Sequence, residues 1–237
     1  MKYMPTYFGA VILGIPLLLF LFYSRPDLRH KMIYMGILIT FVAPLDTFFI
    51  PTYWHPKILM SLFGLPIDIF TLLFGFELGS IASVLYEEWS KRTFVSDKKK
   101  RHPLKYIVLL GPISLFILKE FTQLNFMYDV LISTIIAIAT IILVRPDLLY
   151  DVIYSGILFS VIYGSLLSLY LFLFPNVILA WNLYSFPQHF ILNIPVYEIL
   201  WGFVSGAFIG PLYEFTHDDV LRQLPQFTNS RTKKRDR

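Results

Sequence analysis

The chain of 237 residues contains no cysteine. Disulfide bonds, thiolate metal sites and a cysteine nucleophile are therefore excluded. Charge is also scarce, because Asp, Glu, Lys and Arg together make up only 15% of the residues, against about 25% in a typical soluble domain. This shortage excludes a soluble enzyme, a disordered chain and a nucleic-acid-binding module.

Hydrophobic residues are correspondingly abundant. They make up 56% of the chain, aromatic residues make up 18%, and the mean hydropathy is +0.63. A bilayer core needs about 20 apolar residues per helix, and seven apolar segments stand out, of which the third is long and the fourth is short. They are residues 5–23, 33–50, 58–86, 106–118, 126–144, 153–174 and 191–213. The sequence predicts an all-α polytopic membrane protein with about seven transmembrane helices.

The basic residues predict how these helices are oriented. With seven spans, seventeen of the 20 Lys and Arg residues fall on one side, and only Lys2, Lys57 and Lys119 fall on the other. The positive-inside rule then places the N-terminus outside and the C-terminus in the cytoplasm. The first segment lacks a small-residue cleavage site, so we expect a retained helix in the cell membrane. Topology also explains the pI near 9.1, so we expect no nucleic-acid partner.

An internal repeat divides the chain. The motif Arg25-Pro26-Asp27-Leu28 recurs as Arg145-Pro146-Asp147-Leu148 at an offset of 120 residues. We predict two parallel three-helix repeats, residues 1–90 and 126–218, related by an axis along the membrane normal. Residues 91–125 would supply a basic cytoplasmic loop and a linking helix, and residues 219–237 a basic cytoplasmic tail. The basic loop serves either to fix topology or to contact anionic lipid heads.

Small residues recur at four-residue spacing in the third helix of each predicted repeat. They are Gly75 and Gly79 in the first, and Gly202, Gly206 and Gly210 in the second. Such a stripe lines one helix face and lets another helix approach closely. We therefore expect these five glycines to pack helices, and the two repeats to dock through their third helices.

Two acids lie near these stripes. Asp68 precedes Gly75 by seven residues and Glu198 precedes Gly202 by four, which places them within about 20° and 40° of the stripe. An ionisable group inside a bilayer is a candidate functional residue. In the alternative interpretation, Pro66 and Pro195 begin the helices, and the two acids only complement the helix dipole at the membrane surface.

Two further acids lie deeper in the predicted spans. Glu77 lies about 16 Å beyond Pro66 along its helix, and Asp46 lies in the outer half of the second span. Either residue lines a cavity or hydrogen-bonds a neighbouring helix. Glu87 and Glu214 come at the cytoplasmic ends of their helices, where we expect them to be interfacial. The five histidines lack metal-ligand spacing, so no metal site is predicted.

A family resemblance follows from the proline-acid motifs. The segment Gly64-Leu65-Pro66-Ile67-Asp68-Ile69, followed by Tyr86-Glu87, resembles the lycopene cyclase domain of membrane-embedded carotenoid cyclases. The segment Ile194-Pro195-Val196-Tyr197-Glu198-Ile199, followed by Tyr213-Glu214, is similar to a second copy. The resemblance covers both repeats. The family signature has two adjacent acids after Pro-x, whereas each copy here keeps one.

The resemblance implies a cofactor-free isomerisation of a hydrophobic isoprenoid or carotenoid in membrane lipid. An acid protonates a terminal double bond, the tertiary cation closes a six-membered ring, and a base removes a proton. Asp68, Glu198, Glu77 and Asp46 are the implied acids and bases, and Pro66, Pro195, Tyr197 and Trp201 the implied substrate contacts. The alternative is a non-catalytic carrier or binding subunit of the same fold. The oligomeric state does not follow from the sequence.

Overall fold

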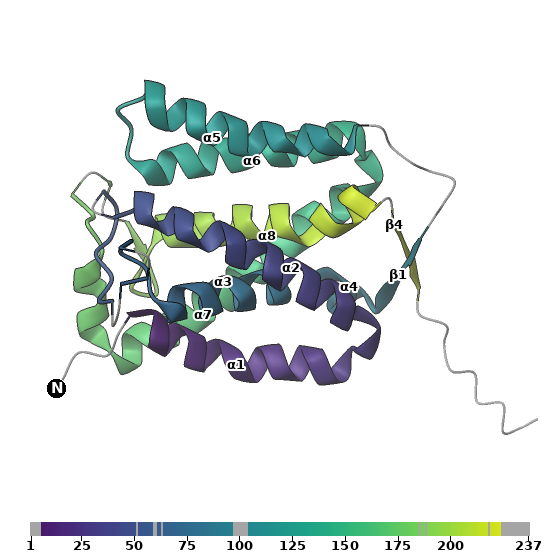
Figure 1. Ribbon diagram of the computed structural model, residues 1–237. Helices are drawn as coiled ribbons and strands as arrows, with labels where there is room; N and C mark the ends of the chain where they lie inside the picture. Colours follow the sequence, from purple (N-terminus) through teal and green to yellow (C-terminus); the bar gives the residue numbers. More distant parts are fainter. Residues whose placement is uncertain are drawn as a thin grey trace, which may run out of the picture.

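The computed structural model describes residues 6–50, 52–58, 61–62, 64–96, 104–184, 186–187, 189–217 and 219–223. Residues 98–101 of the predicted basic loop and residues 224–237 of the predicted tail lie outside the described residues. Within the described part the chain is a bundle of helices that run side by side (Figure 1). The predicted all-α architecture is confirmed.

Three helices and their short extensions form the first half of the bundle, which we call the N-terminal triple. These elements are α1 (Thr6–Ser24), η1 (Pro26–Leu28), α2 (Arg29–Val42), η2 (Ala43–Phe48), α3 (Ile69–Ala82) and α4 (Leu85–Ser90). Pro26 begins the turn between α1 and α2 because proline suits the first position of a helix. Helix α3 packs on both α1 and α2.

The second half, which we call the C-terminal triple, has a similar order of elements, with the single helix α8 in place of α3 and α4. Its helices are α6 (Phe126–Val144), η4 (Pro146–Leu148), α7 (Leu149–Leu173), η5 (Pro175–Ala180) and α8 (Val196–His217). Helix α8 packs on both α6 and α7, as α3 does on α1 and α2. Between the triples come η3 (Lys105–Leu109) and α5 (Leu110–Phe121), which pack against α6.

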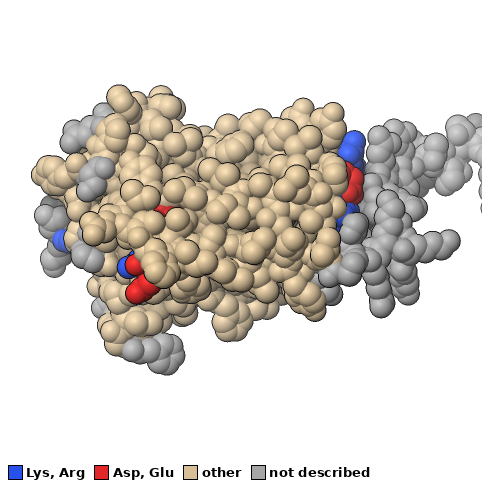
Figure 2. Space-filling view, turned by 90° about the horizontal axis from the view of Figure 1, so that it is seen from above, with Lys and Arg blue, Asp and Glu red and all other residues tan. Residues whose placement is uncertain are grey.

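Within the described residues, six helical segments are long and apolar enough to cross a membrane. Helix α5, at 12 residues, is the short exception among the predicted spans. Charged side chains gather towards the two ends of the molecule, and the long middle part of the face in Figure 2 shows none. This distribution suits a protein that crosses a bilayer, because charged groups avoid the hydrocarbon core.

In the described part of the chain, four short strands lie at the two ends of the bundle. Strand β1 (Arg92–Ser96) pairs antiparallel with β4 (Asp219–Gln223), with Arg92 opposite Gln223, at the end where the Arg-Pro-Asp turns lie. Strands β2 (Phe190–Ile191) and β3 (Ile194–Pro195) form a second antiparallel pair immediately before α8. The η2 and η5 segments lie at this second end (Figure 1).

The glycine stripes pack helices within each triple and not between the triples. A Cβ atom on Gly79 would lie 2.4 Å from the carbonyl oxygen of Met35 in α2, and one on Gly206 would lie 2.6 Å from that of Ser155 in α7. Gly75 also faces α2, whereas Gly202 and Gly210 face α7. The predicted docking of the repeats through these stripes is therefore wrong. The stripes serve the closest helix pairs, α2 with α3 and α7 with α8, where side chains would hold the backbones apart.

Each Arg-Pro-Asp turn holds the end of the third helix of its own triple. Arg25 pairs with Asp27 at 2.7 Å, and its Nη1 donates to the Glu87 carbonyl oxygen at 2.8 Å. Arg145 pairs with Asp147 at 2.7 Å and donates to the Glu214 carbonyl oxygen at 3.3 Å. The turns therefore connect sequence-distant helix ends by the same geometry in both triples.

Candidate functional site

A cavity lies between the two triples. Its walls come from α1, α3, α6, α7 and α8, and the segments that follow η2 and η5 contribute further lining residues. The centre of a water-sized sphere can move within about 160 Å³ of this cavity. On the same measure, a cavity that holds one water has about 10–15 Å³. The cavity therefore has room for part of an organic ligand.

The chemistry of the lining is unusual for an apolar cavity. Ten of its 22 lining residues are aromatic, and its only ionisable side chains besides tyrosines are the acids Asp46, Glu77 and Glu198. No Lys, Arg or His is among the described lining residues. Carboxylates and aromatic faces both attract cations, so the cavity is suited to an apolar ligand that becomes positively charged.

Among the described residues, Glu198 accepts more hydrogen bonds than either of the other two acids. It is the third residue of α8 and is 6% exposed. Its Oε1 accepts hydrogen bonds from Tyr53 Oη at 2.7 Å and Trp181 Nε1 at 2.8 Å, and its Oε2 accepts one from Tyr163 Oη at 2.5 Å. The three donors come from both triples, so the halves of the chain meet at this carboxylate.

Tyr53 stays a hydrogen-bond donor over the physiological pH range. Burial is the main cause that raises the pKa of its hydroxyl above the ordinary value, and the negative charge of Glu198 raises it further. A protonated hydroxyl has a hydrogen to give to the carboxylate. Tyr53 therefore remains protonated and orients Glu198 through the hydrogen bond to Oε1.

The segments after η2 and η5 join over this end of the cavity. His55 N donates to the Ala180 carbonyl oxygen, and Asn182 N donates to that of Tyr53, both at 2.6 Å. This pairing places the rings of Trp54 and Trp181 5.8 Å apart. Trp54 Nε1 donates to Asp46 Oδ1 at 3.3 Å, as Trp181 does to Glu198. Two tryptophans thus orient two of the three acids.

Glu77 lies on α3 with different surroundings. It is 5% exposed, and its buried Oε1 receives no hydrogen bond from any described residue. Gly14 of α1 faces it, since a Cβ atom at position 14 would lie 2.5 Å from Glu77 Oε2. The glycine therefore makes room for a carboxyl group whose buried Oε1 has no hydrogen-bond partner among the described residues.

The other predicted site residues lie outside the cavity lining, with one exception. Trp201 lines the cavity, whereas Asp68, Pro66, Pro195 and Tyr197 do not. Asp68 caps α3 by accepting from the backbone nitrogens of Phe70 and Thr71 at 2.9 and 3.0 Å. Tyr197 packs on Phe186, and the ring centroids lie 4.5 Å apart.

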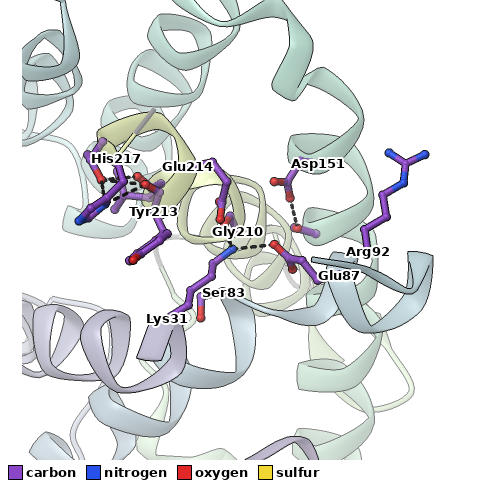
Figure 3. A network of polar contacts seen from close by, with 12 residues as sticks. Lys31, Ser83, Glu87, Arg92, Asp151, Gly210, Tyr213, Glu214 and His217 are labelled. Atoms are coloured by element: carbon purple, nitrogen blue, oxygen red, sulfur yellow. Dashed lines mark hydrogen bonds and ion pairs between the residues drawn. The ribbon is translucent and has the colours of Figure 1, made fainter. Parts of the chain in front are cut away.

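A second buried polar cluster lies towards the β1–β4 end. Lys31 Nζ is 2.7 Å from both Glu87 Oε1 and Glu214 Oε1, and it donates to the Gly210 carbonyl oxygen at 3.2 Å (Figure 3). Carboxylate oxygens of Glu87, Glu214 and Asp151 lie within 4.8 Å of one another. The lysine supplies a cation to this group of acids and joins α2 to α4 and α8.

The burial of this cluster corrects an expectation from the sequence. Glu87 and Glu214 are both 0% exposed, so the prediction that they are interfacial is wrong. Position in the chain was the reason for that prediction, but Lys31 and the Arg-Pro-Asp turns cover the helix ends. A signal was present: Lys31 and Asp151 lie 120 residues apart, at the same offset as the repeated motif.

The hydrogen-bond donors around Glu198 were also missed. Tyr53, Tyr163 and Trp181 lie in an aromatic-rich sequence, and nothing in their local pattern distinguishes them from side chains that only fill the bundle. The matching spacing of Trp54 and Trp181, 127 residues apart, was the available signal, because Tyr86-Glu87 and Tyr213-Glu214 share that offset.

Comparison with known proteins supports the motif resemblance in the second half of the chain. Residues 125–216, which include Glu198, Tyr163 and Trp181, match a family model described as lycopene cyclase. No curated protein and no solved structure gave a match. The match covers the C-terminal triple, which is therefore similar to the lycopene cyclase family.

Proposed function

We propose that this protein catalyses acid-initiated cyclisation of a linear carotenoid or related isoprenoid inside the membrane. The observation that carries the proposal is the apolar, aromatic cavity between the triples, with its three acids and no described basic residue. The lycopene cyclase match over residues 125–216 supports the same chemistry.

The proposed reaction is an isomerisation that needs acid and base groups but no redox change. A carboxyl group donates a proton to the terminal double bond, and a tertiary cation forms. The next double bond attacks this cation and closes a six-membered ring, and a carboxylate then removes a proton. Positioned acids and bases of this kind typically contribute about 10²–10⁴-fold to a rate.

The cavity lining suits each stage of that reaction. The aromatic rings of Trp201, Tyr163 and Trp54 face a ligand that carries positive charge during ring closure, and aromatic faces attract cations. The carboxylate of Glu198 lies among the same rings. Exclusion of water by the apolar walls protects the cation from hydration, which would otherwise give an alcohol.

The proposal also includes the arrangement of the chain in the membrane. We place it in the cell membrane with the N-terminus outside and the C-terminus in the cytoplasm, as the distribution of basic residues indicates. The matching order of helix contacts in the two triples supports a fused pair of repeats. The cavity then lies towards the outer face, and the Lys31 cluster towards the cytoplasmic face.

The test is to express the chain in a bacterial host that accumulates lycopene and to separate the extracted pigments by chromatography. New monocyclic or bicyclic pigments should form, and the wild-type ring product should disappear with Glu198→Gln. Gln keeps the shape of the side chain and removes its charge. Unchanged lycopene, with the wild-type protein present in the membrane fraction, would overturn the assignment and favour a non-catalytic carrier.

A further inference from the structure

The two most buried acids of the cavity have opposite surroundings. Glu198 accepts hydrogen bonds from three side chains, whereas the buried Oε1 of Glu77 receives none from the described residues. Pairs of acids in contrasting environments commonly divide the acid and base roles of one reaction. We infer that Glu77 donates the initiating proton and that Glu198 receives the final one. This inference rests on the proposed function and adds the direction of proton transfer between the two acids.

Glu198 is arranged as an acceptor. Trp181 Nε1 can only donate, and it shares Glu198 Oε1 with the Tyr53 hydroxyl, while the Tyr163 hydroxyl bonds Oε2. Donors therefore reach both oxygens, and charge-assisted hydrogen bonds of this kind hold a carboxylate in a defined orientation. A tertiary carbocation loses a proton readily, so an oriented carboxylate is sufficient to receive it.

Glu77 is arranged as a donor. Burial of a charged carboxylate oxygen without a hydrogen bond is costly, and the described residues give Glu77 Oε1 no hydrogen bond. The acid form of Glu77 avoids that cost and carries the proton that the reaction needs. The apolar residues Phe74, Leu78 and Ile81 of the same helix line the cavity with Glu77. An alkene in the cavity is therefore the base that such a proton would meet.

Asp46 fits the donor role less well. Its Oδ1 already accepts from Trp54 Nε1 at 3.3 Å, and Tyr7 and Glu198 are close enough to interact with it electrostatically. It lies with Glu198 at the end of the cavity that the two tryptophans cover. Because Asp46 lies near Glu198, it is placed to take up the proton from Glu198 after turnover.

The proposed steps balance without an oxidant or reductant. The O–H bond of Glu77 breaks and a C–H bond forms at the terminal alkene carbon, which leaves a cation on the adjacent tertiary carbon. The next alkene supplies its electron pair for the ring C–C bond, and loss of a proton to Glu198 forms the ring double bond. Glu77 ends as a carboxylate and Glu198 as an acid, and proton exchange with water restores both.

Gly14 offers a way to move the donor without removing it. In Gly14→Ala the new methyl carbon would lie 2.5 Å from Glu77 Oε2, so the carboxyl group must shift. Asp is shorter than Glu by one methylene, so Glu77→Asp should fit beneath that methyl group. Gly164→Ala on α7 is the matched control, because its new carbon would meet Ile194 only at 4.0 Å.

The experiment compares lycopene consumption and product identity in the lycopene-accumulating host. Glu77→Gln should reduce total consumption at least 100-fold, because the reaction does not begin. Glu198→Gln should still consume lycopene, but into pigments with a shifted ring double bond or an added hydroxyl group, because the cation loses its normal base. Gly14→Ala should lower consumption, Glu77→Asp should restore part of it in the double variant, and Gly164→Ala should match the wild type.

The outcomes separate this inference from the function on which it rests. If wild-type protein consumes no lycopene, both are overturned. If wild-type protein cyclises lycopene but Glu77→Gln keeps its rate, or if the two Gln variants exchange their product patterns, only the assigned direction is overturned. Thermal unfolding of each purified variant distinguishes loss of a proton donor from loss of fold.

Discussion

Lys31 Nζ lies 2.7 Å from Glu214 Oε1, and this ion pair joins α2 of the N-terminal triple to α8 of the C-terminal triple. Both side chains are buried, with 4% and 0% exposure. The same ammonium pairs with Glu87, whose carbonyl oxygen accepts from Arg25. This cluster and Glu198 are thus two of the polar points at which the halves of the chain meet, and the cavity adjoins the second.

Removal of the lysine should destabilise the protein strongly. In Lys31→Met the acids Glu87, Glu214 and Asp151 lose their shared cation in a buried site, and breaking a buried ion pair from one side costs about 3–5 kcal/mol. We expect a loss of that size in the free energy of unfolding, measured by denaturant titration in mixed micelles. Lys119→Met is the control, because Lys119 is exposed on α5. Equal stability of the two variants would contradict this role.

The hydrogen-bond donors of Glu198 should affect the chemical step more than substrate binding. Tyr163→Phe removes the donor to Oε2 and leaves the ring in the cavity wall. Because a lost hydrogen bond to a charged group costs about 1.5–3 kcal/mol, we expect the kcat for the wild-type ring product to fall at least tenfold while KM changes little. Tyr154→Phe, also on α7, is the control, since Tyr154 stacks on Trp89 with the ring centroids 4.7 Å apart and lies outside the cavity lining. A selective rise in KM for Tyr163→Phe would contradict the positioning role.

The glycine stripes should tolerate no added methyl group. Gly206→Ala would place a carbon 2.6 Å from the Ser155 carbonyl oxygen and 2.5 Å from Phe159 Cβ. Overpacking of this kind costs about 1–3 kcal/mol, and we expect a corresponding fall in the thermal unfolding temperature. Gly164→Ala, with nothing nearer than 4.0 Å, should leave that temperature within error. An equal effect at the two positions would contradict the close packing of α7 and α8.

The absence of cysteine makes the proposed orientation directly measurable. A single cysteine can be introduced by Lys57→Cys, in the segment after η2, or by Lys91→Cys, after α4, without any background label. In intact cells a membrane-impermeant maleimide should label Cys at position 57 and leave position 91 unlabelled until the cells are opened. The reverse pattern would invert the proposed topology.

Hydropathy was sufficient to predict the helices of this fold. Six of the seven predicted spans coincide with segments that the structure makes long and apolar enough to cross a membrane, because bilayer thickness sets their length. The partner of a small-residue face was not predictable in the same way. A stripe such as Gly75 and Gly79 indicates that a helix packs closely there, but not which helix, and the partner is the sequence neighbour α2.

The acids were accessible to sequence reasoning, but their surroundings were not. Glu198, Glu77 and Asp46 attract notice because charge inside an apolar span is rare, and the structure brings all three to one cavity. Asp68 has the same sequence signal but caps a helix, a difference that depends on where α3 begins. Tyr53 and Trp181 reach Glu198 from loops far apart in the chain, and no local spacing encodes that meeting.

The most direct test of the account is conversion by the purified protein in lipid nanodiscs, supplied with lycopene and no added cofactor. The account predicts a cyclic product with the same molecular mass as lycopene, because ring closure only moves a proton and electron pairs. It also predicts that the particular ring isomer formed by the wild type is absent with Glu198→Gln. Lycopene recovered unchanged from folded wild-type protein, or a product whose mass shows gain or loss of hydrogen, would contradict it.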